Sequence, residues 1–153
     1  CISNAMNVGH PSNLARLVDL YGGHLDEVGV CHRLPDMDGI RRDMWATSIN
    51  DAQTRECIAA TYKAHGTILE PHGAVGWAAL ERGLQAGEVD DDELAIVLET
   101  AHPAKFPDEV SKLIGVDPEV PPALARIETL EEHYDRLGVD YPAFKDVVKA
   151  TYG

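Results

Sequence analysis

Three reactive side-chain types directly follow the most apolar short segment of the chain. Thr100, His102 and Lys105 provide a hydroxyl, an imidazole and an amine within one short run. The preceding residues 94–98 (LAIVL) have the length and composition of a buried parallel strand, and Pro103 suits the first turn of a helix. Ligands of open α/β sheets bind where strands end and helices begin. The sequence therefore predicts a binding site at this junction.

A second junction of the same kind carries another histidine. His72 follows Pro71 after residues 67–69 (TIL), a second strand candidate. Because the carboxyl ends of parallel strands share one sheet edge, we expect His72, His102 and Thr100 to surround a common, half-open cleft. An imidazole titrates near neutral pH and can transfer protons, but a half-buried histidine bonded to a backbone carbonyl has the same sequence signature. Both roles stay open for each histidine.

Strand and helix signals alternate along the chain. We expect strands at 45–49, 67–69 and 94–98, and helices at 12–21, 51–65, 71–84, 103–114, 123–137 and 142–152. Ser12 or Asn13 is suited to cap the first helix, and Asn50 or Asp51 the second. This alternation is typical of α/β folds with a parallel sheet.

Composition and charge exclude several classes of function. The net charge of −13 repels nucleic acids and anionic membranes, and no apolar run approaches the length of a membrane span. The cysteines are odd in number and far apart, which argues against a disulfide framework and favours a reducing, cytoplasmic location. No spacing typical of a metal site occurs, and the acidic run 90–93 is expected to be a solvated turn. Gly73 and Gly76 do not match a dinucleotide-binding fingerprint.

Three segments resemble one enzyme family. Residues 100–106 (TAHPAKF) are similar to the TAHPAKF signature of threonine synthase, residues 3–13 (SNAMNVGHPSN) to its SNAMDVGxPSN stretch, and residues 70–76 (EPHGAVG) to its PHxAVG stretch. The segments occur in the family's order. Asn7 replaces the usual aspartate, which puts in doubt any role that needs a charge there, and Gly73 replaces what is often a larger residue.

The resemblance implies a fold and a place in a longer protein. Threonine synthases are enzymes that depend on pyridoxal 5′-phosphate (PLP). Their three-layer α/β fold is related to that of the tryptophan synthase β subunit. We therefore expect residues 1–153 to be a helix-rich, single-domain, C-terminal fragment with a small parallel sheet and a variable helical tail at about 117–153. The partner of this fragment would be the N-terminal portion of the same chain.

The resemblance also implies an activity and its residues. The family is a lyase of threonine biosynthesis that converts O-phospho-L-homoserine and water to L-threonine and phosphate. Thr100 takes the place of the hydroxyl that faces the cofactor's pyridine nitrogen, although the sequence also allows it to cap a helix at Pro103. The Schiff-base lysine belongs to the N-terminal portion, so Lys105 is not expected to serve as one. We expect no catalytic residue and no metal site in this chain, which alone should be inactive.

Other interpretations remain. Asn4, Ser12 and Asn13 can bind substrate or pin a loop; helix capping explains Ser12 and Asn13 but leaves Asn4 open. The chain can also be a free-standing, non-catalytic α/β domain that binds a ligand or a protein. A relative of threonine dehydratase would share the fold, but the amino-acid sequences of the segments 3–13 and 100–106 argue against it.

Overall fold

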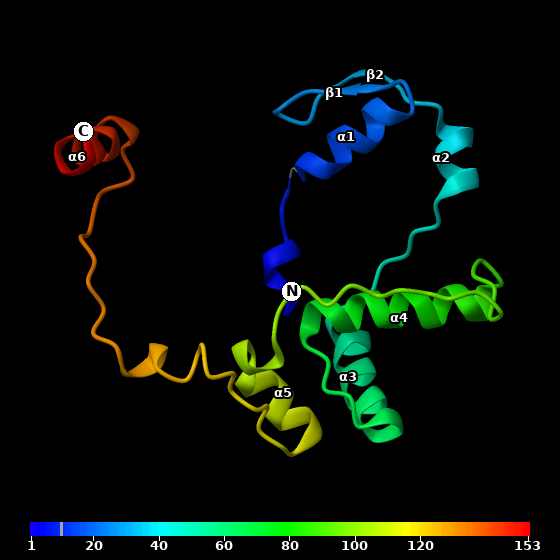
Figure 1. Ribbon diagram of the computed structural model, residues 1–153. Coiled ribbons are helices and arrows are strands. Elements are labelled where there is room, and N and C mark those ends of the chain that lie inside the picture. Colours follow the sequence, from blue (N-terminus) through cyan, green and yellow to red (C-terminus); the bar gives the residue numbers. More distant parts are fainter. Residues whose placement is uncertain (10) are drawn as a thin grey trace. The chain divides into compact units, whose positions relative to one another are not determined.

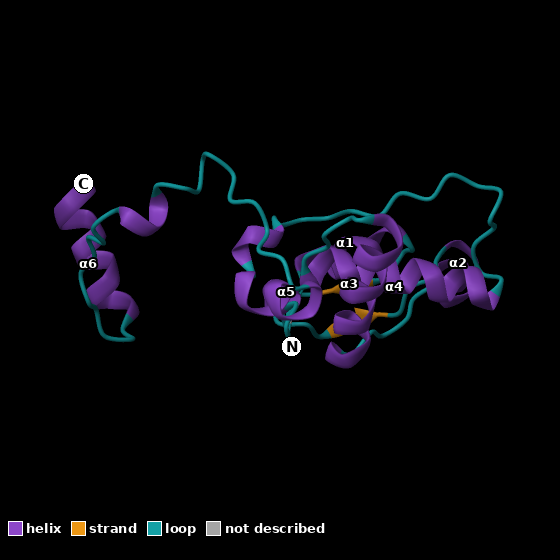
Figure 2. Cartoon of the chain, turned by 90° about the horizontal axis from the view of Figure 1, so that it is seen from below, coloured by secondary structure: helices purple, strands orange, loops and turns teal. Residues whose placement is uncertain are grey.

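The computed structural model describes residues 1–9 and 11–153, so His10 of the 3–13 segment lies outside the described residues. The elements in chain order are η1 (Asn4–Met6), α1 (Ser12–Leu20), β1 (His24–Leu25), β2 (Cys31–Arg33), α2 (Met37–Asp43), α3 (Asp51–His65), α4 (Pro71–Ala86), η2 (Pro103–Lys105), α5 (Pro107–Ile114), η3 (Ile127–Thr129) and α6 (Tyr141–Tyr152). Helices and loops dominate, and the strands are short (Figure 2). The predicted helix-rich character with one small sheet is confirmed.

The helices α3 and α4 begin and end at local sequence signals. Asn50 accepts a hydrogen bond from the backbone N–H of Gln53, and the Gln53 side chain accepts from the N–H of Asn50, so the two residues form a capping box. Helix α3 ends at Gly66 in the left-handed conformation, with φ of 68°. Helix α4 begins at Pro71, as predicted, and continues to Ala86. These boundaries follow from cap, proline and glycine positions alone.

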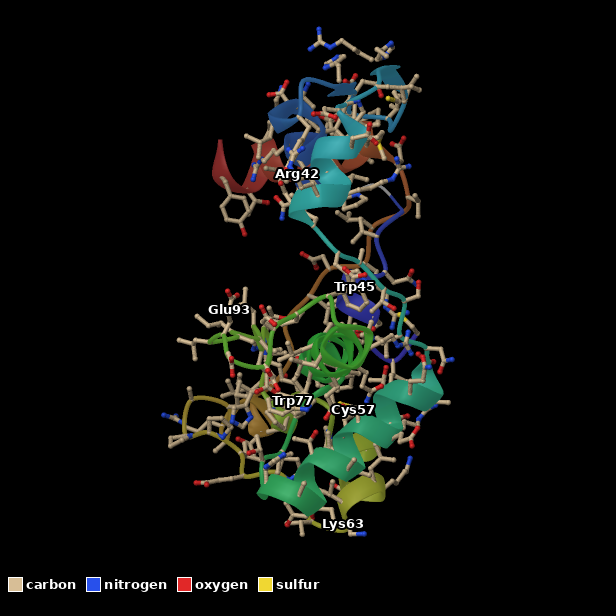
Figure 3. All side chains as sticks on the ribbon, turned by 90° about the vertical axis from the view of Figure 1, so that its right-hand side faces the viewer. Arg42, Trp45, Cys57, Lys63, Trp77 and Glu93 are labelled. Atoms are coloured by element: carbon tan, nitrogen blue, oxygen red, sulfur yellow. The ribbon has the colours of Figure 1, made fainter. Side chains whose placement is uncertain are left out.

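The core lies between α3, α4 and α5. Its buried members are Cys57, Ile58, Leu69 and Ala74, with Trp77, Ala78, Leu113 and Ile114 packed against them. Figure 1 shows α3, α4 and α5 grouped together. Cys57 comes from α3 and Trp77 from α4, and both are labelled in Figure 3. Burial raises the pKa of the Cys57 thiol, so this cysteine is a core residue with little thiolate character.

The sheet differs from the predicted parallel one. Strands β1 and β2 form an antiparallel pair in which His24 lies opposite Arg33. Within the described ranges 1–9 and 11–153, the predicted strands 45–49, 67–69 and 94–98 run outside helices but join no sheet. A strand is defined by its hydrogen-bonded neighbour, and the part of the chain described here offers these segments no such neighbour. The apolar pattern was read correctly, but the pairing was not.

The segment after α4 runs back along a glycine face of that helix. Gly73, Gly76 and Gly83 leave room for it: a Cβ atom at these positions would lie 2.9 Å from Glu99 Cγ, Val97 Cγ1 and Val89 Cγ2, respectively. Figure 1 shows this extended segment beside α4. Close approach of two backbones is a common use of glycine. The α4 glycines therefore determine where the residues leading to Thr100 lie.

The N-terminal part forms a small assembly of α1, the hairpin and α2. Asp26 closes the hairpin by accepting hydrogen bonds from the backbone N–H groups of Val28 and Val30 and from His32, which together hold the pKa of Asp26 below its usual value, with the His32 bond the largest cause. Asp36 caps α2 through the N–H of Gly39. Neither the β1–β2 hairpin nor α2 was predicted, since residues 24–44 have no clear periodicity.

Two helix boundaries differ from the predicted ones. Helix α1 follows Pro11 without a side-chain cap, so neither Ser12 nor Asn13 caps it. The helix expected at 103–114 is divided into η2 and α5, because Pro107 begins a new helix at its N-terminus.

The chain divides into two compact units, residues 1–119 and 120–153. The second unit contains η3 and α6. The helix predicted at 123–137 is wrong: only turns and the short η3 form there. Residues 131–137 are exposed throughout, and a short helix without a packed face gains too little to persist. Among the described residues, no helix is both long enough and apolar enough to cross a membrane.

Candidate functional site

One pocket of the first unit brings the three sequence segments together. It has a volume of about 290 Å³ and is lined by Ser3, His72, Val75, Gly76, Leu98 and Thr100. Segment 3–13 contributes Ser3, the start of α4 contributes His72, and the extended segment on the α4 glycine face contributes Thr100. The predicted sharing of one opening by His72 and Thr100 is confirmed. The pocket offers a hydroxyl and an imidazole beside apolar walls.

Both ring nitrogens of His72 are bonded. Its Nε2 accepts a hydrogen bond from the backbone N–H of Ala5 at 3.2 Å, and its Nδ1 lies 2.5 Å from Glu70 Oε2. Because Nε2 accepts, the ring proton is on Nδ1, which donates it to the carboxylate. The ring also packs against Phe106, with 5.3 Å between centroids. This geometry favours the structural role among the two roles that the sequence left open.

Glu70 is the buried partner of this histidine. Its side chain has no solvent exposure, and its carboxylate accepts from the backbone N–H groups of His72 at 2.9 Å and Gly73 at 2.7 Å as well as from the imidazole. A buried carboxylate is tolerated when donors surround it, and the helix N-terminus adds a favourable dipole. Sequence reasoning missed Glu70, although its position before Pro71 marks a helix cap.

Glu99 connects the Thr100 segment to the same helix end. Its Oε1 accepts a hydrogen bond from the backbone N–H of Glu70 at 2.9 Å. Its Cγ lies over Gly73, at the place where a larger residue would put its Cβ. The glycine that departs from the family pattern thus makes room for Glu99. Glu99 was not predicted, since an acidic residue after an apolar run reads as solvent-exposed.

His102 does not join the opening that His72 and Thr100 share. Its Nδ1 accepts a hydrogen bond from the backbone N–H of Ala104 at 3.1 Å and so caps η2. It lines a different pocket of about 330 Å³, together with Glu99 and residues near Pro118. The prediction of a three-residue cluster is therefore wrong for His102. Lys105 is exposed at the end of η2.

The remaining candidates lie outside the pocket lining. Asn4 is exposed in η1, one residue before the Ala5 N–H that bonds to His72. Ser12 is the first residue of α1, and Asn13 accepts from Arg16 at 3.1 Å. Among the residues with described positions, no group of three or more histidine, cysteine or acidic side chains could hold a metal ion.

Comparisons with known proteins point to the same family as the three segments. The family model described as threonine synthase, C-terminal, matches residues 73–148. The chain is 33% identical over 144 residues to threonine synthase of Pseudomonas aeruginosa, which covers 86% of this chain and 30% of that protein. It is 31% identical over 158 aligned residues to threonine synthase of Serratia marcescens, which covers 99% of this chain and 28% of that protein.

A solved structure agrees. The PLP-bound threonine synthase from Brucella melitensis matches with a TM-score of 0.66 and 25% identity, over 78% of this chain and 25% of that one. The helix-rich chain with its small sheet thus matches a fragment of a PLP-dependent α/β fold. The chain spans between 25% and 30% of the length of these relatives. Taken together with the converging segments, these matches show that the chain belongs to the threonine synthase family.

Proposed function

We propose that this chain is the C-terminal portion of a PLP-dependent threonine synthase, a cytoplasmic lyase that converts O-phospho-L-homoserine and water to L-threonine and phosphate. The observation that carries the proposal is the single pocket in which Ser3, His72 and Thr100 meet. These residues come from the three segments that resemble the family, although up to 97 positions separate them in sequence. Relatives named threonine synthase match nearly the whole chain.

The pocket suits one part of the cofactor. The Thr100 hydroxyl can both donate and accept a hydrogen bond, and Val75 and Leu98 provide apolar contact for an aromatic ring. By its place in the TAHPAKF segment, Thr100 is proposed to face the pyridine nitrogen. A hydroxyl there leaves the ring less strongly protonated than a carboxylate would. PLP itself supplies the electron sink that the reaction needs.

This chain is proposed to supply binding and orientation rather than a catalytic group. Thr100 is exposed, so the pocket is one wall that the rest of the protein would complete. Leu94, Ile96 and Leu98, which precede it, are 91%, 78% and 76% exposed. Such alternating apolar exposure is typical of a surface that another element covers. It supports the fragment over a free-standing domain.

The test uses the full-length gene product and Thr100. We expect the intact protein to release phosphate from O-phosphohomoserine in the presence of PLP. Thr100→Ser, which keeps the hydroxyl, should retain the cofactor's absorbance spectrum and most of the turnover. Thr100→Asp should change the spectrum and greatly lower turnover, because the carboxylate favours a protonated ring. A wild-type spectrum and rate for Thr100→Asp would refute the contact.

The isolated 153-residue chain is the matched comparison. It should release no phosphate under the same conditions, because effective catalysis needs the groups of both portions in fixed geometry. Reproducible turnover by this chain alone would show that it is not the dependent fragment proposed here. A full-length product that lacks threonine synthase activity would instead favour a binding domain.

A further inference from the structure

We propose that Glu70 is a positioning residue for the Thr100 pocket. Through His72 it holds the 3–5 segment on one side, and through its backbone N–H it holds the Glu99–Thr100 segment on the other. The assignment of this pocket to PLP rests on the proposed function. The positioning itself rests only on contacts within the chain.

The first arm runs from Glu70 to Ala5. The buried carboxylate accepts the Nδ1 proton of His72, which leaves Nε2 free to accept from the Ala5 N–H. Without the carboxylate nothing in this contact chain would fix the ring proton on Nδ1, and a proton on Nε2 would turn the acceptor toward Ala5 into a second donor. Glu70 thus selects the tautomer that binds Ala5, two residues from Ser3 in the pocket wall.

The second arm runs from Glu70 to Thr100. The backbone N–H of Glu70 donates to Glu99 Oε1 at 2.9 Å, and Glu99 is the residue directly before Thr100. The Glu99 side chain also lies against Gly73 in the first turn of α4. One residue therefore sets the distance between the two walls of the pocket, because both arms begin at the same helix terminus.

Two simpler roles explain less of the geometry. Helix capping alone does not require glutamate, since asparagine, aspartate and serine are the preferred N-cap residues. Capping also leaves the contact to the imidazole without a purpose. A proton-transfer role for His72 would require one ring nitrogen to be available, yet both are engaged.

The experiment compares the complete 153-residue chain with two variants. Glu70→Asp keeps a good N-cap for α4, but its shorter side chain does not reach the imidazole. His72→Asn keeps an N–H donor at the Nδ1 position and removes the acceptor for Ala5. Proton-detected nitrogen NMR of the imidazole reads the tautomer of His72, and amide hydrogen exchange reads the bonds of Ala5 and Gly73.

We expect the wild-type chain to carry the His72 proton on Nδ1. Glu70→Asp should populate both tautomers and speed exchange of the Ala5 amide about fivefold to tenfold, the effect of one lost hydrogen bond, while Gly73 stays protected. His72→Asn should speed exchange at Ala5 to the same extent. If the Ala5 amide exchanges at the wild-type rate in Glu70→Asp, Glu70 is only a helix cap. If the wild-type His72 carries its proton on Nε2, the proposal is wrong whatever the variants show.

A second measurement separates this proposal from the proposed function. In the full-length gene product, Glu70→Asp should weaken the binding of PLP about fivefold to tenfold, since the pocket wall at Ser3 then loses its support through His72, while the backbone N–H that holds Glu99 is kept. If the wild-type product binds no PLP, the proposed function fails while the NMR result still decides the positioning. If the wild type binds PLP and Glu70→Asp binds it equally well, the positioning role fails alone.

Discussion

Val97 lies directly against the backbone of α4 at Gly76, so close that a Cβ on Gly76 would be 2.9 Å from Val97 Cγ1. Carbon atoms in contact normally stay about 3.5–4.0 Å apart. This contact fixes the position along α4 at which the extended segment crosses the helix. Val97 lies three residues before Thr100.

Gly76→Ala tests that contact. The added methyl should displace Val97 and shift the NMR signals of Leu98 and Thr100, while the gain of about 1 kcal/mol in helix propensity offsets much of the steric cost to stability. Adding Val97→Ala should restore the Thr100 signal, because it removes the atom that the methyl meets. Signals that stay unchanged in Gly76→Ala would mean that the segment does not rest on this glycine.

The core of the first unit should depend on Ile58. This side chain is fully buried, at 0% exposure, so Ile58→Ala should lower the free energy of unfolding by about 2–5 kcal/mol through lost burial and a cavity. Ile96, at 78% exposure, is the matched control, and Ile96→Ala should change stability by less than about 0.5 kcal/mol. Urea unfolding measures both, and equal effects would place Ile58 outside the core.

Asn50 should contribute through its cap. Asn50→Ala removes the acceptor for the Gln53 N–H and should cost about 1 kcal/mol of unfolding free energy. Asn50→Asp keeps an oxygen acceptor and should stay close to the wild type. Thermal unfolding followed by circular dichroism distinguishes the two, and a stable Asn50→Ala would show that α3 does not need its capping box.

The ion pair between Arg55 and Glu109 should make the free energy of unfolding depend on pH. The hydrogen bond from Arg55 is the largest cause that lowers the pKa of Glu109. The stabilisation that the ionised Glu109 carboxylate gives the folded state is therefore complete above its unfolded-state pKa of about 4.3. It is lost as the pH falls through the lower folded-state pKa. Because the pair is partly exposed, the effect should be small.

Glu109→Gln provides the comparison for that pair. The variant should be slightly less stable than the wild type at pH 7, and the difference should vanish once the pH has fallen below the lowered folded-state pKa of Glu109, where the wild-type carboxylate is also protonated. Urea midpoints across this range measure it. A difference that persists in strong acid would point to packing rather than to charge.

Local signals in the sequence predicted the central helices well. Asn50, Gly66 and Pro71 act on their own neighbouring residues, so their effect does not depend on distant parts of the chain. The predicted strands failed because pairing is a property of two segments, and the apolar pattern of 94–98 describes only one. The predicted helix at 123–137 failed because its second half, residues 131–137, is exposed throughout and gains little from packing.

The candidate site was predicted in part. The two predicted strand–helix junctions placed Thr100 and His72 correctly in one pocket, although the strands assumed there do not pair within the described residues. His102, which also lies next to a proline, serves as a cap instead. Glu70 was missed because carboxylates are rarely buried, and Glu99 because an exposed acidic residue gives no sign in the sequence of a backbone contact. Their roles depend on backbone N–H groups that only the folded helix terminus presents together.

The unpaired segment 94–98 has a consequence for how this protein behaves in solution. Three exposed aliphatic side chains on an extended, proline-free backbone form a template on which another chain can add a strand. Acidic residues stand at both ends, with the run 90–93 before it and Glu99 after it. Charges at such positions act as gatekeepers that oppose β-aggregation. We therefore expect the acidity of the 90–93 turn to oppose self-association of this segment where nothing else covers it.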